Sequence, residues 1–257
     1  MYKMKLAVQL YTLREFLQTP EDIRETFQKV KAIGYDAVQV SGVGMVDEEK
    51  AAVIKQAAKD NDLAICATHV SFKELQENLD WVIEFHKQWG CSYVGVGSMP
   101  AEYRDKEGYS RFAKEASEIG RKLKEHGLYF IYHNHSFEFE KFEGKTGMDI
   151  LFEESDPESF YFELDTYWVQ AGGANPVDWI NKVKGRMQVV HFKDMGVDKE
   201  HKPMITEVGE GNLNWPAIIQ ACEDTNVIWA AVEQDVCLRD PFESVEMSLR
   251  YLQGQGF

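Results

Sequence analysis

Short apolar runs alternate with longer amphipathic segments from one end of the chain to the other. The short runs are rich in β-branched and aromatic residues without a clean polar alternation, which is typical of strands in a sheet covered on both faces. The longer segments place apolar residues at helical spacing. Because no proline-rich or serine-rich linker interrupts this order, the pattern predicts repeated strand–helix units in a single domain, residues 1–257.

Eight strand candidates and eight helix candidates fit this pattern. The predicted strands are Lys5 to Tyr11, Ala37 to Ser41, Ala64 to His69, Tyr93 to Gly97, Tyr129 to His133, Tyr161 to Asp165, Gln188 to Phe192 and Trp229 to Glu233. The predicted helices are Pro20 to Ala32, Asp47 to Asn61, Phe72 to Trp89, Lys106 to His126, Asp149 to Glu154, Pro176 to Lys184, Trp215 to Asp224 and Pro241 to Leu252. Eight such units predict a closed (β/α)8 TIM barrel. An open doubly wound sheet, the alternative, needs a glycine-rich turn after the first strand, and Gln9 to Arg14 contains no glycine.

Residues at the predicted helix ends support this division. Thr19 is an N-cap residue directly before Pro20, and proline is favoured at the first helical position. Gly34, Gly90 and Gly127 each follow a helix, where a left-handed residue ends it. Capping chemistry therefore predicts the same boundaries as the hydrophobic periodicity.

The composition restricts the classes of partner. The 257 residues include 43 acidic and 28 basic side chains, and the formal net charge of −15 opposes binding to nucleic-acid phosphates. No apolar window approaches the length of a membrane helix, and Met1 to Leu10 lacks the apolar core of a secretory signal. Cys66, Cys91, Cys222 and Cys237 lack metal-binding spacing, so they are expected to be reduced thiols. We expect a soluble, cytoplasmic protein without nucleic-acid or membrane partners.

Metal-ligand residue types gather where the predicted strands end. They are His69 after the third strand, His133 and His135 after the fifth, Asp165 after the sixth, His191 after the seventh and Glu233 after the eighth. The carboxyl ends of barrel strands form the active site, so these side chains are predicted to converge. Carboxylates mixed with imidazoles suit Mn²⁺, Mg²⁺, Co²⁺ or Zn²⁺ and leave positions for substrate oxygens. The pattern therefore predicts a divalent metal site.

Two further polar residues lie close to these strand ends. Glu138, in the loop after the fifth strand, is either an additional ligand or a solvated loop carboxylate. Lys193 shares a strand face with His191, which allows either a catalytic role or an ion pair with Asp165 or Glu163.

Candidate substrate-binding residues lie on the same predicted rim. Tyr11 and Trp168 fall just beyond strand ends, where aromatic rings suit the apolar faces of sugars. His69 belongs to this rim as well. Glu210 stands between two glycines, which would let the backbone approach a ligand.

The residues at these positions resemble those of a known family. The matching stretches are Val8 to Arg14, Tyr132 to His135, Glu163 to Trp168, His191 to Asp194, Val208 to Asn212 and Val232 to Asp235. In this order they resemble the xylose isomerase-like barrels called sugar phosphate isomerases/epimerases, which include ketose 3-epimerases, inosose dehydratases and type IV apurinic endonucleases. The endonuclease branch has a metal-binding histidine where this chain has Trp168, which counts against a DNA substrate.

The resemblance also implies a ligand set. In the epimerase branch a divalent metal, often Mn²⁺, is held by a glutamate, an aspartate, a histidine and a second glutamate at the ends of strands five to eight. Asp165, His191 and Glu233 match the last three. His133 stands where those epimerases have the first glutamate, with His135 and Glu138 as nearby alternatives.

The leading hypothesis from the sequence is a metal-dependent isomerase or epimerase that acts on a ketose or keto-sugar through an enediolate. Glu233 is expected to take or return the proton. His133 or His135 would act on the opposite face, and Lys193 would steady the oxyanion. If the enediolate expels a β-oxygen, the enzyme is instead a dehydratase or lyase acting on an inosose or a 3-keto-glycoside.

A sugar-binding barrel without turnover is the third alternative. The partner is a small sugar in every case. The sequence allows a homodimer but specifies no interface.

Overall fold

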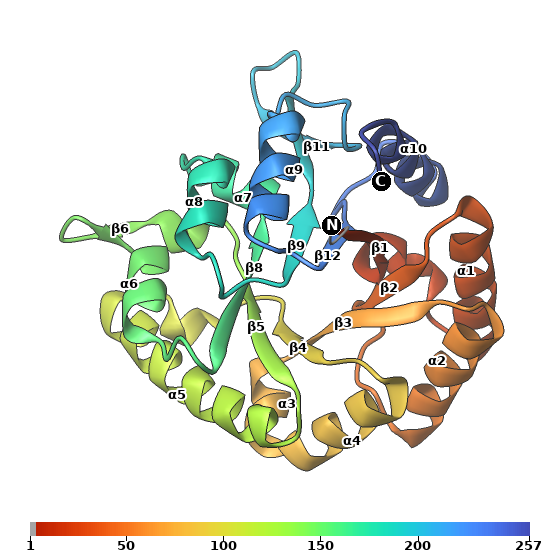
Figure 1. Ribbon diagram of the computed structural model, residues 1–257, viewed down its shortest axis with the longest axis horizontal. Helices are drawn as coiled ribbons and strands as arrows, with labels where there is room; N and C mark the ends of the chain where they lie inside the picture. Colours follow the sequence, from red (N-terminus) through yellow and green to blue (C-terminus); the bar gives the residue numbers. More distant parts are fainter. Residues whose placement is uncertain (1–3) are drawn as a thin grey trace.

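Residues 4–257 are described by a computed structural model, in which the eight predicted strands close into a parallel barrel (Figure 1). The strands are β1 (Lys5–Gln9), β2 (Ala37–Val40), β3 (Ala64–Val70), β4 (Tyr93–Val96), β5 (Tyr129–His133), β8 (Phe160–Asp165), β9 (Val189–Phe192) and β12 (Trp229–Val232). Each strand pairs with its neighbour in the chain order of the barrel, and β12 pairs with β1 to close it. The (β/α)8 barrel predicted from the sequence is confirmed.

Helices surround the barrel, as Figure 1 shows. They are α1 (Pro20–Ile33), α2 (Glu48–Asp60), α3 (Phe72–Glu77), α4 (Leu79–Trp89), α5 (Lys106–Glu125), α6 (Gly147–Glu154), α7 (Thr166–Ala171), α8 (Pro176–Lys182), α9 (Trp215–Asp224) and α10 (Pro241–Gly254). The single helix predicted from Phe72 to Trp89 is wrong, because Asn78 leaves helical geometry and ends α3 before α4 begins. Among residues 4–257, no helix is long and apolar enough to cross a membrane.

The hydrophobic pattern of the sequence does not predict the short elements at the strand ends. The first predicted strand ends at Gln9 instead of Tyr11, because the Gln9 side chain accepts a hydrogen bond from the Tyr11 amide and starts a 3-10 helix, η1 (Leu10–Phe16). The other short elements are the hairpins β6 (Lys141–Phe142) with β7 (Lys145–Thr146) and β10 (Asp194–Val197) with β11 (Pro203–Thr206), and the 3-10 turns η2 (Ala101–Tyr103) and η3 (Phe137–Phe139).

The predicted caps are present. Thr19 accepts a hydrogen bond from the Asp22 amide, and the Asp22 carboxylate accepts one from the Thr19 amide, which completes a capping box at α1. Gly34 and Gly90 end α1 and α4 in the left-handed conformation. These contacts fix the lengths of the helices that pack around the barrel.

The barrel interior has an apolar layer beneath a polar one. The apolar layer contains Ala7, Ala37, Cys66, Ala67, Ile131, Val189 and Ala231. Residues two positions further along a strand point to the same face, so Ala7 is followed by Gln9, Ile131 by His133, and Ala231 by Glu233. The strand sequences thus place a polar layer on top of a closed apolar floor, at the carboxyl end of the barrel.

His86 is buried outside this polar layer, and we therefore predict that the stability of the fold depends on pH. His86 contacts the Val82 carbonyl and the Thr68 hydroxyl, and burial lowers its pKa to about 4. The unfolded chain binds this proton near pH 6.5, so folding loses up to about 3 kcal/mol as the pH falls from about 6.5 to 4. In urea unfolding at several pH values, a His86→Gln variant should show a shallower loss over this range. Equal slopes for the two proteins would contradict the prediction.

Candidate active site

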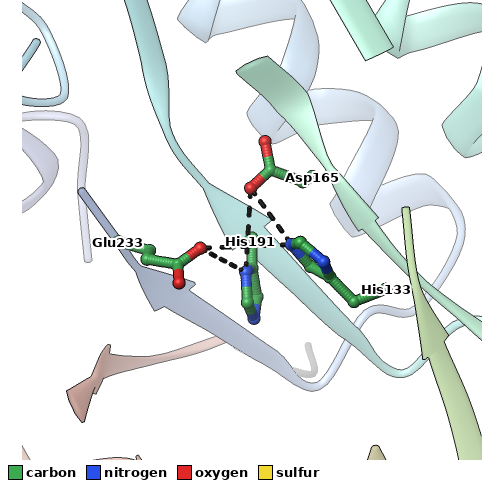
Figure 2. A group of neighbouring side chains, drawn as sticks. All are labelled: His133, Asp165, His191 and Glu233. Atoms are coloured by element: carbon green, nitrogen blue, oxygen red, sulfur yellow. Dashed lines mark hydrogen bonds and ion pairs between the residues drawn. The ribbon is translucent and has the colours of Figure 1, made fainter. Parts of the chain in front are cut away.

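Four of the predicted ligands converge at the carboxyl end of the barrel (Figure 2). The Asp165 Oδ2 atom lies 3.3 Å from Nε2 of His133 and 3.8 Å from Nδ1 of His191. The Glu233 Oε2 atom lies 2.9 Å from the same His191 nitrogen and 4.0 Å from the His133 nitrogen. All four side chains are buried. We call His133, Asp165, His191 and Glu233 the four-residue cluster.

The four-residue cluster has the spacing of a single-ion site. Ligands bound at about 2.0 to 2.2 Å to one ion lie about 3 to 4.2 Å from one another in tetrahedral or octahedral sites. The four separations between a carboxylate oxygen and an imidazole nitrogen, 2.9 to 4.0 Å, fall in that range, and all the donor atoms lie within 4.8 Å of one another. Two carboxylates and two imidazoles suit a borderline or hard divalent cation. The donor set therefore fits the metal that the sequence predicts, and His133 is the residue that β5 contributes.

Both imidazoles of the four-residue cluster are oriented by their second nitrogen. His133 Nδ1 lies 3.0 Å from the Gly97 carbonyl oxygen, to which it donates. His191 Nε2 lies 2.9 Å from Oε1 of Gln39. Such contacts fix the tautomer of a histidine ligand and leave the other nitrogen free to bind an ion.

Lys193 lies against the same carboxylates. Its Nζ atom is 2.9 Å from Asp165 Oδ2, 2.8 Å from Glu233 Oε2 and 2.8 Å from Asp235 Oδ2. The lysine side chain is fully buried. The sequence allowed either a catalytic role for Lys193 or an ion pair with Asp165 or Glu163. The ion pair with Asp165 is present, and the carboxylates of Glu233 and Asp235 also contact the lysine ammonium. A lysine enclosed by three carboxylates balances part of their charge.

The charges of the site depend on one another. Burial acts to raise the pKa values of the Asp165 and Glu233 carboxyl groups, but the Lys193 ammonium, together with the contacts from His133 and His191, holds both well below the usual range. Burial acts to lower the pKa of His191, but the carboxylates of Glu163 and Glu233 raise it well above its ordinary value. The two carboxylates therefore stay ionised and available as ligands.

A second ring of residues supports the four-residue cluster. Gln9 Nε2 donates to Oε1 of Glu233 at 3.1 Å, and Gln39 Nε2 donates to Oε1 of Glu163 at 2.9 Å. Glu163 Oε2 lies 2.5 Å from Nε2 of His69. Gln9 and Gln39 were not predicted from the sequence. Each lies in the last two residues of its strand, two positions after an inward-facing alanine, and this alternation of strand faces is the signal that would have identified them.

A cavity of about 400 Å³ opens beside the cluster. Its lining residues are Gln9, Tyr11, Ser41, His69, Val70, Ser71, Gly97, Ser98, His133, His135, Glu233 and Asp235. This volume lies in the range of small-molecule sites. A larger cavity of about 570 Å³, between the loop before α8 and the β10–β11 hairpin, has no ionisable side chain among its described lining residues. The smaller cavity is therefore the candidate substrate site.

The predicted substrate-binding and accessory residues divide between the cavity and its surroundings. Tyr11, His69 and His135 line the cavity. The Trp168 ring centroid lies 5.2 Å from that of His135 and 5.6 Å from the Lys193 ammonium, which places Trp168 beside the cavity. Glu138 is buried, so it is not the solvated loop carboxylate that the sequence allowed, and its carboxylate accepts hydrogen bonds from the Tyr132 hydroxyl and the His135 amide instead of joining the cluster.

Glu210 lies on a loop built around Asp194. The Asp194 carboxylate is buried and accepts hydrogen bonds from the amides of Met195, Gly209, Gly211 and Leu213 and from Nε1 of Trp215. A Cβ atom at Gly211 would lie 2.4 Å from Asp194 Oδ1, so the loop requires glycine there. Glu210 itself is exposed and is not among the described lining residues of the cavity. Its role in substrate binding stays a prediction.

Comparison with known proteins places the chain among related barrels. Residues 27–253 match the xylose isomerase-like TIM barrel family. An inosose dehydratase of Lacticaseibacillus casei is 26% identical over 161 residues, 56% of this chain and 53% of that protein. An inosose dehydratase of Clostridium beijerinckii is 25% identical over 174 residues, 59% of this chain and 56% of that protein. The matches thus span about half the length of these curated relatives.

The likeness in three dimensions extends over the whole barrel. A solved structure of a sugar phosphate isomerase/epimerase from Parabacteroides distasonis superposes with a TM-score of 0.80 and covers 99% of this chain and 95% of its own. Its sequence is 22% identical. At this low sequence identity, the structural similarity shows a shared fold and nothing more.

Proposed function

Because this chain belongs to the xylose isomerase-like TIM barrel family, we propose that it is a divalent-metal-dependent enzyme that acts on a keto-sugar. The observation that carries the proposal is the four-residue cluster, whose donor atoms face one another beside a cavity of about 400 Å³. Two carboxylates and two imidazoles from four strand ends direct their donor atoms toward one point, which is the arrangement that a divalent cation requires. His133, Asp165, His191 and Glu233 would hold the ion.

When bound, the ion would supply Lewis-acid polarisation of the substrate carbonyl. Glu233 is better suited to bind the ion than to act as a general base, because Lys193 and His191 keep the pKa of Glu233 well below its usual range despite burial. His133 donates from Nδ1 to the Gly97 carbonyl and turns Nε2 toward Asp165, so it is assigned to the ion as well. Lys193 keeps the carboxylates in place.

The cavity wall supplies the substrate contacts. Tyr11 and Trp168 would lie against apolar faces of the sugar ring. His135 keeps one ring nitrogen, Nδ1, without a hydrogen-bond partner, and so does the indole Nε1 of Trp168. Buried polar atoms normally have a hydrogen-bond partner, and we propose that substrate hydroxyls supply it here.

Removal of a proton next to the carbonyl leads to one of two products. Epimerisation returns the proton to the opposite face, whereas elimination expels a β-oxygen as water. We favour elimination, hence a dehydratase acting on an inosose or a related cyclic keto-sugar. One reason is that His133 stands where the epimerases carry a glutamate. The other is the similarity to inosose dehydratases over about half of their length.

Product analysis tests the proposal. The purified protein is incubated with an inosose, a ketohexose and a methyl 3-keto-glucoside, each with Mn²⁺ and each with excess chelator. We expect loss of one water from the inosose, detected by mass spectrometry, only when Mn²⁺ is present. An isomer of unchanged mass would favour epimerisation. Sugar binding without conversion, indifferent to chelator in calorimetry, would favour a binding protein and contradict the proposal.

A further inference from the structure

His69 occupies a special position on the cavity wall. It follows the apolar part of β3, and its side chain is 11% exposed. Its Nε2 atom lies 2.5 Å from Oε2 of Glu163, a carboxylate that is fully buried. Its Nδ1 atom has only a long contact of 3.4 Å, to the amide nitrogen of Gln9. One ring nitrogen is therefore firmly held while the other remains available.

Hydrogen bonding decides which nitrogen of His69 carries the proton. Gln39 turns its oxygen toward His191 Nε2 and its amide nitrogen toward Glu163 Oε1. Glu163 thus accepts a hydrogen bond on Oε1 and leaves Oε2 as the acceptor for His69. The hydrogen on His69 is then placed on Nε2, and the lone pair lies on Nδ1. A histidine oriented in this way by a carboxylate has the arrangement of a general base.

Two glycines, Gly95 on β4 and Gly97 directly after it, make room for the ring. His69 pairs with Gly95 on the neighbouring strand, and a Cβ atom at Gly95 would lie 2.9 Å from Cδ2 of His69. A Cβ atom at Gly97 would lie 2.7 Å from Nδ1 itself. Any larger residue at either position would have to displace the imidazole. The neighbouring strand therefore accommodates the ring of His69 in this place.

The other groups at the cavity are less suited to take a proton. His133 uses one nitrogen on the Gly97 carbonyl and the other on Asp165. Glu233 uses one oxygen on Gln9 and shares the other with Lys193. His135 has a free Nδ1 atom, but no hydrogen-bonded carboxylate is recorded for it among the described residues. Among the described residues at the cavity, His69 alone combines an orienting carboxylate with a ring nitrogen that has no contact shorter than 3.4 Å.

We propose that His69 is the catalytic residue that removes the substrate proton at Nδ1, with Glu163 as its positioning residue. The assignment rests on the proposed function, because it needs a keto-sugar in the cavity. The carbon–hydrogen bond next to the carbonyl breaks, its proton goes to Nδ1, and its electron pair forms the enolate. The enolate then expels the β-oxygen, which takes the proton from Nδ1 and leaves as water. His69 returns to its starting state, and the products are an unsaturated ketone and water.

A single nitrogen that both takes and delivers the proton determines the stereochemistry. The hydrogen and the departing oxygen must lie on the same face of the ring, so the elimination is expected to be syn. Epimerisation would need another acid on the opposite face. His69 thus narrows the substrate to cyclic keto-polyols with a hydrogen and a β-hydroxyl on one face.

The test compares His69→Ala with Glu163→Gln in the dehydration of the inosose, with a surface histidine variant, His126→Ala, as matched control. His69→Ala should lose about 10²- to 10⁴-fold in kcat, the usual contribution of a positioned base. It should keep its Mn²⁺ affinity and melting temperature, and added imidazole should restore part of the rate. At saturating Mn²⁺, Glu163→Gln should lower kcat while leaving KM and the melting temperature unchanged, which distinguishes positioning from folding.

Different results of this experiment would overturn the assignment of His69 and the proposed function. Turnover by His69→Ala within about threefold of the wild type would overturn the assignment, since a positioned base contributes far more. Loss of Mn²⁺ affinity in His69→Ala would overturn it too, because His69 would then serve the ion. A wild-type protein that converts none of the three keto-sugars would overturn the proposed function, and the assignment with it.

Discussion

Asp165→Asn is expected to lose divalent-cation binding and turnover together, while the barrel stays folded. The Oδ2 atom of Asp165 is shared by His133, His191 and Lys193, so its charge is central to the four-residue cluster. Asparagine keeps the size of the side chain and can still cap α7, as Asp165 does for the Trp168 amide. Mn²⁺ affinity should fall by more than about 10²-fold, because loss of an outer-shell partner alone costs about 10- to 100-fold.

A matched control is the same change at another helix cap. Asp105 caps α5 through the Gly108 amide and lies outside the cavity, so Asp105→Asn should leave Mn²⁺ affinity and turnover unchanged. Isothermal titration with Mn²⁺ and an assay of inosose dehydration measure both quantities. Undiminished Mn²⁺ affinity in Asp165→Asn would show that the four-residue cluster is not the metal site.

Lys193→Met is expected to destabilise the protein strongly in the presence of chelator. Methionine fills a similar volume but leaves Asp165, Glu233 and Asp235 without the ammonium that contacts all three. Removal of one partner from a buried ion pair typically costs about 3 to 5 kcal/mol, which lowers the melting temperature of a chain of this size by about 10 °C. The loss should become smaller when Mn²⁺ is added, because a bound divalent cation restores positive charge to the carboxylates.

Thermal unfolding with chelator and with Mn²⁺ measures this effect. Lys106 makes an exposed ion pair with Glu143, so Lys106→Met is the matched control and should leave the melting temperature unchanged. If Lys193→Met melted at the wild-type temperature in chelator, Lys193 would not be the residue that balances these carboxylates. If Mn²⁺ gave the variant no protection, the cation would bind elsewhere.

Much of the barrel follows from local patterns in the sequence. The run from Tyr129 to His133 is apolar until its last residue, and it forms β5 with those bounds. The helix from Trp215 to Asp224 is likewise recovered, because Asn214 caps it and Pro216 stands in its first turn. Strand parity and capping are local properties, and this is why they predict the elements and the end of the barrel at which polar residues gather.

The structural features that the sequence pattern did not predict depend on contacts between residues far apart in the chain. The break at Asn78 has no proline or glycine to signal it, and the β10–β11 strands are only four residues long. The choice of His133 over His135 as the strand-five member of the cluster depends on the Gly97 carbonyl, which lies on another strand end. The pairing of His69 with Glu163 joins residues 94 positions apart. Such contacts form only in the folded barrel, so local sequence patterns do not predict them.

His133, Asp165, His191 and Glu233 are proposed to bind one divalent cation. A crystal of the wild-type protein grown with Mn²⁺ and measured at the manganese absorption edge tests it most directly. We predict a single strong anomalous peak among His133 Nε2, Asp165 Oδ2, His191 Nδ1 and Glu233 Oε2. An anomalous map without a peak at that position, or with the manganese bound by other residues, would contradict the account.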